Sequence, residues 1–324
     1  MRILDETAVD ALLTPQLALD AMRALFALPA DAAGYGRVDL HHPVGWLRAL
    51  PGFLTPLGVF GLKTIHRTDG VGMRYTIYVH DLESGVLRGL VDGLAVTNLR
   101  TGAVTATAAD LLAVPEVDVA ALVGTGPVAE GQLLLLDLVR PAREVRVYAR
   151  TPASRRRFIE RMAGRVTSTL IEAESLDAAI NAAQMVTLAT KATEPILTGT
   201  HLAPGIHVNS VGPASRDRVE VDPGTFASFD RVVCDSVELV THEAGDAFEA
   251  VNGGLFDPGT ADDLADLVAG RVPGRRSPDE TTLFKSVGTG LQDLIVAARL
   301  LEASESAGIG RVVDDFVSVK PLPR

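Results

Sequence analysis

The first residues that could do chemistry form a glycine-rich turn, Gly124-Thr125-Gly126-Pro127-Val128-Ala129. An apolar run over 117–123 precedes this turn and a leucine-rich stretch follows it, so it joins a predicted strand to a predicted helix. In this context the spacing Gly-x-Gly-x-x-Ala is typical of a turn that places a pyrophosphate on a helix N-terminus, although an ordinary strand-to-helix turn is the alternative. Gly124 permits the tight turn, Gly126 lets the backbone approach the phosphates, and Ala129 lets the helix pack closely on the strand. The residues expected to contact a dinucleotide are Gly124, Gly126, Pro127, Val128 and Ala129.

The end of the next predicted strand indicates which nucleotide binds. A carboxylate there would accept hydrogen bonds from an adenosine ribose, whereas this chain has Ala149-Arg150-Thr151 and, shortly after, Ser154. A guanidinium and hydroxyl groups suit a 2′-phosphate, so NADP(H) is predicted over NAD(H), with contacts from Arg150, Thr151 and Ser154. The arginines at 155–157 begin a helix and are either further contacts or a solvated face.

Other reactive side chains support no second chemistry. His41 and His42 are expected in a loop and lack a third ligand at a recognised metal-site spacing, so no metal is predicted. Cys234 at a strand end is interpreted as a small buried hydrophobe. The sequence has neither a Gly-x-Ser-x-Gly elbow nor a His-Glu-x-x-His pattern, which leaves hydrolase chemistry without support.

Two kinds of hydrophobic pattern predict the sheets and helices that position these residues. Short apolar runs over 36–92, separated by Gly and Pro turns, predict an antiparallel or mixed sheet. From 117 to 234 strand and helix patterns alternate, which predicts a parallel sheet with crossover helices. Helices are expected over the first 35 residues, where Thr14-Pro15 offers an N-terminal cap, over 94–113 and, as one long helix, over 282–307.

Composition limits the class of protein. A length of 324 residues with 47% hydrophobic residues fits two soluble domains. The formal charge of −11 has the wrong sign for a sequence-independent nucleic-acid binder or an anionic membrane surface. A single cysteine, an acidic N-terminal segment and no run of 18 apolar residues predict a reduced, cytoplasmic setting without a membrane span.

Motifs spread over almost the whole chain resemble those of the ornithine cyclodeaminase and mu-crystallin family. They are Gly61-Leu62-Lys63, the run 81–85, the segment 99–106 with Arg100-Thr101-Gly102, the glycine turn, Ala192-Thr193-Glu194-Pro195, the run 207–212 and the run 279–288. The family includes ornithine and lysine cyclodeaminases, alanine dehydrogenases and ketimine or cyclic imine reductases. Membership implies a homodimer in which both ends of the chain build a substrate-binding and dimerisation domain around an inserted Rossmann domain.

The resemblance also assigns residues. Lys63 matches the family's active-site lysine, Arg100 matches the arginine that binds the substrate carboxylate, and Arg37 looks like a second carboxylate-binding arginine. Two arginines can clamp an α-carboxylate by bidentate hydrogen bonds, and a lysine can donate to the substrate nitrogen or to a water. Positions that resemble the family's cofactor contacts are Thr76, Thr101, Thr190, Val211, Ser286, Val287 and Gly288.

One departure from the family bears on the reaction. Cyclodeaminases carry Gly-Ala-Asp where this chain has Gly212-Pro213-Ala214, and in them the aspartate engages the distal amine of the substrate. A methyl group can neither accept a proton nor pair with an ammonium, and an unpaired charge in a partly closed site costs several kcal/mol. Asp217, three residues on, stands where reductase-like members also tend to have an acid. This pattern favours the reductase branch.

These observations predict an α/β chain with a Rossmann-type parallel-sheet domain over 115–283, inserted in a mixed α+β substrate-binding and dimerisation domain made of 1–114 and 284–324. The predicted activity is NAD(P)H-dependent reduction of a small cyclic imine or ketimine carboxylate, of the pyrroline- or piperideine-2-carboxylate type, or amino-acid dehydrogenation. The alternative is an ornithine cyclodeaminase that converts L-ornithine to L-proline and ammonia with recycled NAD. A binding protein that has kept the cofactor site but lost catalysis is a third interpretation.

Overall fold

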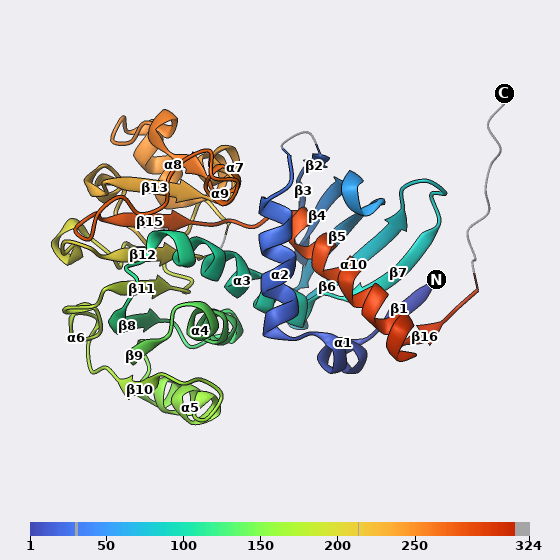
Figure 1. Cartoon of the computed structure of the whole chain (residues 1–324), viewed down its shortest axis with the longest axis horizontal. Helices are drawn as coiled ribbons and strands as arrows, with labels where there is room; N and C mark the ends of the chain where they lie inside the picture. The colour runs from blue at the N-terminus through green and yellow to red at the C-terminus, as the bar shows by residue number, and fades with distance from the viewer. Residues whose placement is uncertain (30–31, 213, 315–324) are drawn as a thin grey trace. The chain divides into compact units, whose positions relative to one another are not determined.

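The computed structural model describes residues 1–29, 32–212 and 214–314 (Figure 1). Contacts group the chain into two compact units. The first unit contains Met1–Ala21, Leu28–Thr97 and the chain from Thr289 on, and the second contains Met22–Ala27 and Asn98–Gly288. The contact grouping therefore divides the chain at Thr97 and Gly288, while the domain boundaries expected at 115 and 283 stay a prediction.

The first unit is built on a mixed sheet. Among the described residues its strands run in the order β16-β1-β7-β6-β5-β4-β2, and β3 pairs with β4. The sheet is mixed because β1 pairs with β7 in parallel while the other pairs are antiparallel. Its strands are β1 (Arg2–Leu4), β2 (Ala33–Tyr35), β3 (Val38–His42), β4 (Gly45–Leu54), β5 (Val59–Thr68), β6 (Gly72–Asp81), β7 (Leu87–Asp92) and β16 (Arg311–Val312). His41 and His42, expected in a loop, belong to β3.

Helices at both ends of the chain accompany this sheet. The helix expected over the first 35 residues forms only part of them: β1 precedes α1 (Glu6–Leu12), and β2 follows α2 (Pro15–Phe26). The predicted cap at Thr14 is confirmed, because its hydroxyl accepts from the Leu17 amide at 3.1 Å. The helix α10 (Gly290–Ala307) packs on β4, β5 and β6. None of the helices formed by the described residues is both long enough and apolar enough to span a membrane.

The second unit is a Rossmann-type fold. Its described strands are all parallel and run in the order β10-β9-β8-β11-β12-β15-β13-β14. The strands are β8 (Val117–Val123), β9 (Ala142–Tyr148), β10 (Thr169–Glu172), β11 (Met185–Leu188), β12 (His207–Ser210), β13 (Arg231–Cys234), β14 (Asp262–Asp263) and β15 (Thr282–Lys285). The helices are α3 (Leu94–Leu112), whose first turn belongs to the first unit, then α4 (Pro127–Val139), α5 (Pro152–Met162), α6 (Leu176–Ile180), α7 (Val237–Glu243), α8 (Gly245–Asn252) and α9 (Leu264–Val268).

The sheet of the second unit has a topological switch point beside β8. The next strand, β9, lies on one side of β8, and β11 lies on the other, so the two crossovers leave in opposite directions (Figure 1). The loops at the carboxyl ends of such neighbouring strands diverge and leave a crevice, which is where open α/β sheets bind ligands. The fold therefore indicates that a ligand site lies at the turns after β8 and β11.

The long helix expected over 282–307 is wrong in its first third. Residues Thr282–Lys285 form β15, a fully buried strand between β12 and β13. Gly288, with φ +78°, then turns the chain before α10 begins at Gly290. Apolar residues of a strand that is buried on both faces do not alternate with polar ones, so their pattern resembles that of a buried helix.

Candidate nucleotide and lysine sites

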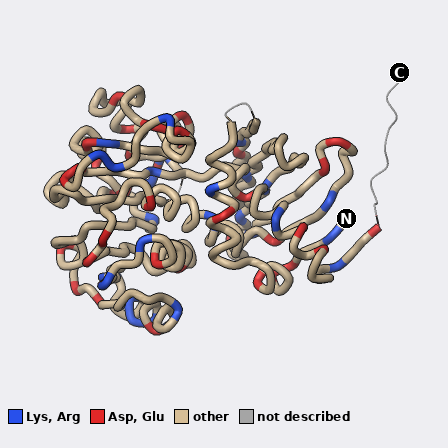
Figure 2. The backbone as a smooth tube through the Cα atoms, in the orientation of Figure 1, with Lys and Arg blue, Asp and Glu red and all other residues tan. Residues whose placement is uncertain are grey.

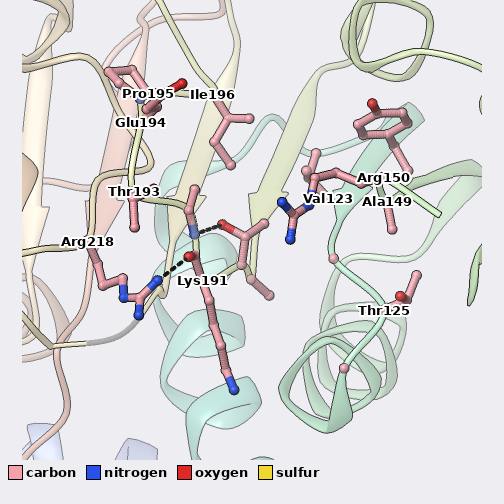
Figure 3. A pocket seen from close by; sticks show the side chains of 16 residues that line it. Val123, Thr125, Ala149, Arg150, Lys191, Thr193, Glu194, Pro195, Ile196 and Arg218 are labelled. Carbon is pink, nitrogen blue, oxygen red and sulfur yellow. Dashed lines mark hydrogen bonds between the residues drawn. The ribbon is translucent and has the colours of Figure 1, made fainter.

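A cavity of about 630 Å³ lies at the switch point of the second unit (Figure 3). It is lined by residues at the carboxyl ends of three strands: Val123–Gly126 at the end of β8, Tyr148–Arg150 at the end of β9, and Ala189–Ile196 after β11, together with Arg218. The cavity thus contains the predicted glycine turn and the predicted nucleotide-selecting strand end. Of the predicted cofactor residues, Gly124, Gly126, Arg150 and Thr190 line it directly.

The two glycines of the turn serve different purposes. Gly124 has φ +121°, and a β-carbon there would come within 2.3 Å of the Ala189 carbonyl oxygen, so only glycine lets β8 turn beside β11. Gly126 is the N-cap of α4 with ordinary extended angles, and a β-carbon there would meet nothing within 4 Å. Pro127 and Val128 follow in the first turn of α4, and Ala129 is fully buried. Open space at an N-cap is what an anionic phosphate at a helix N-terminus requires.

Basic side chains surround this cavity. Arg150, Lys191 and Arg218 all line it, and Glu194 is the acidic side chain among the residues that do (Figure 3). The Arg218 guanidinium donates to the Lys191 carbonyl at 2.7 Å and so ties the loop after β11 to the loop after β12. Sequence reasoning missed Lys191 and Arg218. The signal was a lysine directly after Thr190, at the end of a predicted strand.

The arginines of α5 do not act alike, although Figure 2 shows basic residues concentrated on this helix. Arg155 is buried, donates to the Ala149 carbonyl at 2.7 Å and pairs with Glu172 at 3.0 Å, so it holds the end of β9 in place. Arg156 and Arg157 are exposed. At the start of α5, the Ser154 hydroxyl donates to the Thr151 carbonyl at 2.7 Å.

A buried carboxylate, Glu220, joins the loops that follow β11 and β12. One of its oxygens accepts from the Thr190 amide at 2.7 Å and the Thr190 hydroxyl at 2.8 Å. The other oxygen accepts from the Ser210 hydroxyl at 2.8 Å and the Gly212 amide at 2.9 Å. Burial raises the pKa of Glu220, and the positive charge of Lys285 opposes this rise. Thr190, a predicted cofactor contact, therefore has both of its donors committed to Glu220.

Arg100, the predicted carboxylate-binding residue, is buried on α3 against a tight turn. The turn is Ser286-Val287-Gly288, and the Asp235 carboxylate holds it by accepting from the Ser286 hydroxyl at 2.7 Å, the Val287 amide at 3.1 Å and the Gly288 amide at 2.8 Å. Asp235 was not among the predicted site residues. Thr101 on α3 and Val211 after β12 are both buried within the same unit.

Lys63, the predicted catalytic lysine, is buried in the first unit. Its Nζ donates to the Asp293 carboxylate of α10 at 2.7 Å and to the Thr97 hydroxyl at 2.7 Å, and it lies 5.4 Å from the centre of the Tyr75 ring. Sequence reasoning did not identify Asp293. Its signal was a lone acid within the apolar run of α10.

Two other predicted residues belong to the first unit. Arg37 is half-buried between β2 and β3. Thr76 pairs with Thr64 across β5 and β6, whereas Lys63 pairs with Ile77, so Thr76 and Lys63 project from opposite faces of the sheet. The structure does not bring Thr76 to the lysine.

Comparisons with known proteins agree with this geometry. The sequence profile of the ornithine cyclodeaminase/mu-crystallin family matches residues 8–308. The chain belongs to this family. A Delta(1)-pyrroline-2-carboxylate reductase of Paracoccus denitrificans is 32% identical over 289 residues, which cover 87% of this chain and 90% of that protein. The mouse ketimine reductase mu-crystallin is 32% identical over 233 residues, 72% of this chain and 70% of that protein. The Thermococcus litoralis Delta(1)-pyrroline-2-carboxylate reductase, solved with NADH and L-proline, superposes with a TM-score of 0.92 at 28% sequence identity. The match covers 97% of this chain and 100% of that chain.

Within the ornithine cyclodeaminase/mu-crystallin family, the segment that distinguishes cyclodeaminases begins at Gly212. Pro213 lies outside the described residues, and the match of Ala214 to the cyclodeaminase aspartate stays a prediction. Asp217 is exposed, accepts from the Ser215 hydroxyl and lies 3.5 Å from Arg218; its hydrogen bond from Ser215 is the main cause that lowers its pKa. Cys234 is buried, and burial raises the pKa of its thiol, which agrees with its interpretation as a hydrophobe.

Proposed function

We propose that this protein is an NAD(P)H-dependent reductase of a small cyclic imine or ketimine carboxylate, able also to run as an amino-acid dehydrogenase. The observation that carries the proposal is the glycine turn, which opens onto a basic cavity at the switch point of the sheet. The family includes relatives named Delta(1)-pyrroline-2-carboxylate reductase and ketimine reductase. The second unit is then the dinucleotide-binding domain, and the first is the substrate-binding and dimerisation domain.

The residues of the cavity fit a nicotinamide dinucleotide. Gly126 leaves open space at the N-terminus of α4 for the phosphates, and Pro127, Val128 and Ala129 complete that turn. When bound, the reduced nicotinamide supplies a hydride to the carbon of the C=N bond. Thr101, Thr190, Val211 and the turn 286–288 are the other cofactor contacts that we propose in the second unit, and Thr76 stays a predicted cofactor contact.

The substrate carboxylate is assigned to arginines. Arg100 offers a guanidinium that packs against Gly288, and Arg37 is the proposed second partner. A bidentate grip fixes the α-carbon and removes much of the orientational cost of hydride transfer. Lys63 donates a proton to the imine nitrogen, so that imine, hydride and proton together form the amine.

NADP(H) is the proposed cofactor in preference to NAD(H). Arg150 follows β9 and lines the cavity, and Thr151 and Ser154 add hydroxyl groups beside it. Because no carboxylate follows β9 at this point, a 2′-phosphate would meet a guanidinium without electrostatic repulsion.

A homodimer is proposed from the open face of the first sheet. Gly52 and Gly61 face α10, where β-carbons would contact Leu291 and Leu294. The alternate positions therefore project from the opposite face. That face carries exposed apolar side chains, namely Val38 (54% exposed), Leu40 (60%), Leu47 (37%) and Phe53 (51%). Apolar surface of this kind suits an interface with a second copy. The cytoplasmic setting stays a prediction.

The direct test is the oxidation of NADPH, followed by its absorbance, with Δ1-pyrroline-2-carboxylate and Δ1-piperideine-2-carboxylate. The expected result is stoichiometric conversion of imine to the cyclic amino acid. Ammonia release from L-ornithine without net NADPH oxidation, and no turnover of either imine, would show a cyclodeaminase instead. If the enzyme is a reductase, the Ala214→Asp variant should have a lower or unchanged reductase activity. The same variant tests whether a carboxylate at this position adds cyclodeaminase activity.

A further inference from the structure

The ammonium of Lys63 and the carboxylate of Asp293 form an ion pair inside the first unit. Their atoms are 2.7 Å apart, and both side chains are 0% exposed. The two residues are 230 positions apart in the chain and come from β5 and α10. Burying two charges costs free energy that a close pair only partly recovers.

Hydrogen-bond donation fixes the role of the lysine in this pair. The Thr97 hydroxyl has one proton, which it donates to the Gly93 carbonyl at 2.5 Å. The Thr97 oxygen must therefore accept the bond from Lys63, as the Asp293 oxygen does. Two titratable groups face Nζ in these contacts: Asp293 from α10 and the ring of Tyr75 from β6. A carboxylate and a π-face both favour the ammonium over the neutral amine.

A second buried lysine–aspartate pair in the other unit provides a comparison. Lys285 and Asp246 are also 2.7 Å apart, with side chains 4% and 0% exposed. The same Asp246 oxygen additionally accepts from the backbone amides of Glu220 and Val221, so that pair fastens a loop to the core. The Lys63 nitrogen donates to the side chains of Asp293 and Thr97, as the Lys285 nitrogen donates to those of Asp246 and Ser210, but Lys63 is the one whose nitrogen the proposed reaction uses.

We propose that Asp293 is a positioning residue that keeps Lys63 charged and directs its ammonium as the proton donor of the reaction. This inference rests on the proposed reductase function. In the step, the imine carbon accepts the hydride of the reduced dinucleotide and the imine nitrogen takes a proton from Nζ. One N–H bond of Lys63 breaks, a neutral amine remains beside the Asp293 carboxylate, and solvent returns the proton before the next turnover. Asp293 itself does not touch the substrate.

The test compares pH profiles of kcat/KM for wild type and Asp293→Asn. Removing the carboxylate charge should let Lys63 lose its proton at lower pH, so the basic limb should move down by about one pH unit or more. Titration of the substrate is common to all variants and cancels in the comparison. The dissociation constant of NADPH should change less than about twofold, because the variant keeps the dinucleotide unit intact. The matched control is Asp246→Asn, which should lower the melting temperature but leave the limb in place.

The outcomes separate two failures. If wild type reduces no cyclic imine, the proposed function fails. If wild type is active and Asp293→Asn has the wild-type limb with only a lower melting temperature, Asp293 is merely structural and the inference is overturned. A second measurement needs no Asp293 variant: the ¹⁵Nζ resonance of Lys63, assigned by its absence in Lys63→Arg, should have an ammonium shift at neutral pH. A neutral-amine shift would overturn the inference equally.

Discussion

The guanidinium of Arg100 lies directly against Gly288, where a β-carbon would come within 2.7 Å of Nη1 and 2.9 Å of Nη2. The turn that brings Gly288 there is held by Asp235 through three hydrogen bonds. The predicted carboxylate-binding arginine thus packs against a glycine on a segment far from it in sequence, and a side chain at that glycine would clash with the guanidinium.

Gly288→Ala should therefore displace Arg100. We expect KM for the imine carboxylate to rise about tenfold or more, because a charge-assisted bidentate contact is lost or misaligned. Gly288 also has φ +78°, so alanine adds backbone strain of about 1 kcal/mol. The matched control is Gly308→Ala. At Gly308 φ is +68°, but an added β-carbon would meet no other part of the protein within 4 Å. The control should lose similar stability with unchanged KM; equal KM in both variants would contradict the assignment.

The two glycines of the phosphate turn should fail differently. Gly124→Ala forces a β-carbon against the Ala189 carbonyl, so both the melting temperature and NADPH affinity should fall. Gly126→Ala meets nothing in the protein and should keep the wild-type melting temperature while it weakens NADPH binding about tenfold or more. Fluorescence titration and thermal unfolding provide both readouts. Unchanged affinity in Gly126→Ala would mean that the phosphates do not approach this turn.

Arg150→Ala tests the cofactor preference. Losing a charge-assisted hydrogen bond to a 2′-phosphate should raise KM for NADPH by about 10- to 100-fold and leave KM for NADH within about twofold. Arg157→Ala, which removes an exposed arginine of α5, is the control and should change neither constant. An equal loss for both cofactors would assign Arg150 to the shared part of the dinucleotide.

Acid should destabilise the second unit through His207. This histidine is 0% exposed, and burial is the main cause that lowers its pKa to about 3 from a normal value of 6.5. Because the unfolded chain binds the proton more readily, the stabilisation present above pH 6.5 is lost as the pH falls toward 3. Between about pH 7 and about pH 5 the free energy of unfolding should fall by about 2 kcal/mol from this group alone. His207→Gln should lose about that much less over the same interval in urea unfolding, and an identical pH dependence would contradict the assignment.

The open face of the first sheet should control assembly. Leu40→Asp places a charge on that face, and we expect the dimer dissociation constant to rise about 100-fold or more because the charge would be desolvated. Light scattering coupled to size exclusion should then give the monomer mass. Leu138→Asp changes a similarly exposed leucine of α4, 47% against 60%, and should remain dimeric. A monomeric wild type would refute the proposed dimer.

Much of the molecule could be predicted from the sequence alone. The glycine turn, the parallel sheet around it and the mixed sheet over 36–92 depend on residues close together in the chain, where backbone conformation and apolar periodicity leave a direct signature. Family motifs predicted Lys63 and Arg100 as site residues. The error at 282–307 arose because a strand buried on both faces has no alternation to distinguish it from a helix.

Tertiary structure alone decided which groups meet. Asp293 lies 230 residues from Lys63, and Glu220 lies 30 residues from Thr190, so no local sequence pattern predicts either contact. A side chain's partner depends on how strands and helices pack, whereas a turn depends on the few residues that make it. For this reason the sequence determined the turn where we predict that a phosphate binds, while the fold determined that the lysine pairs with an aspartate and that the arginine packs against a glycine.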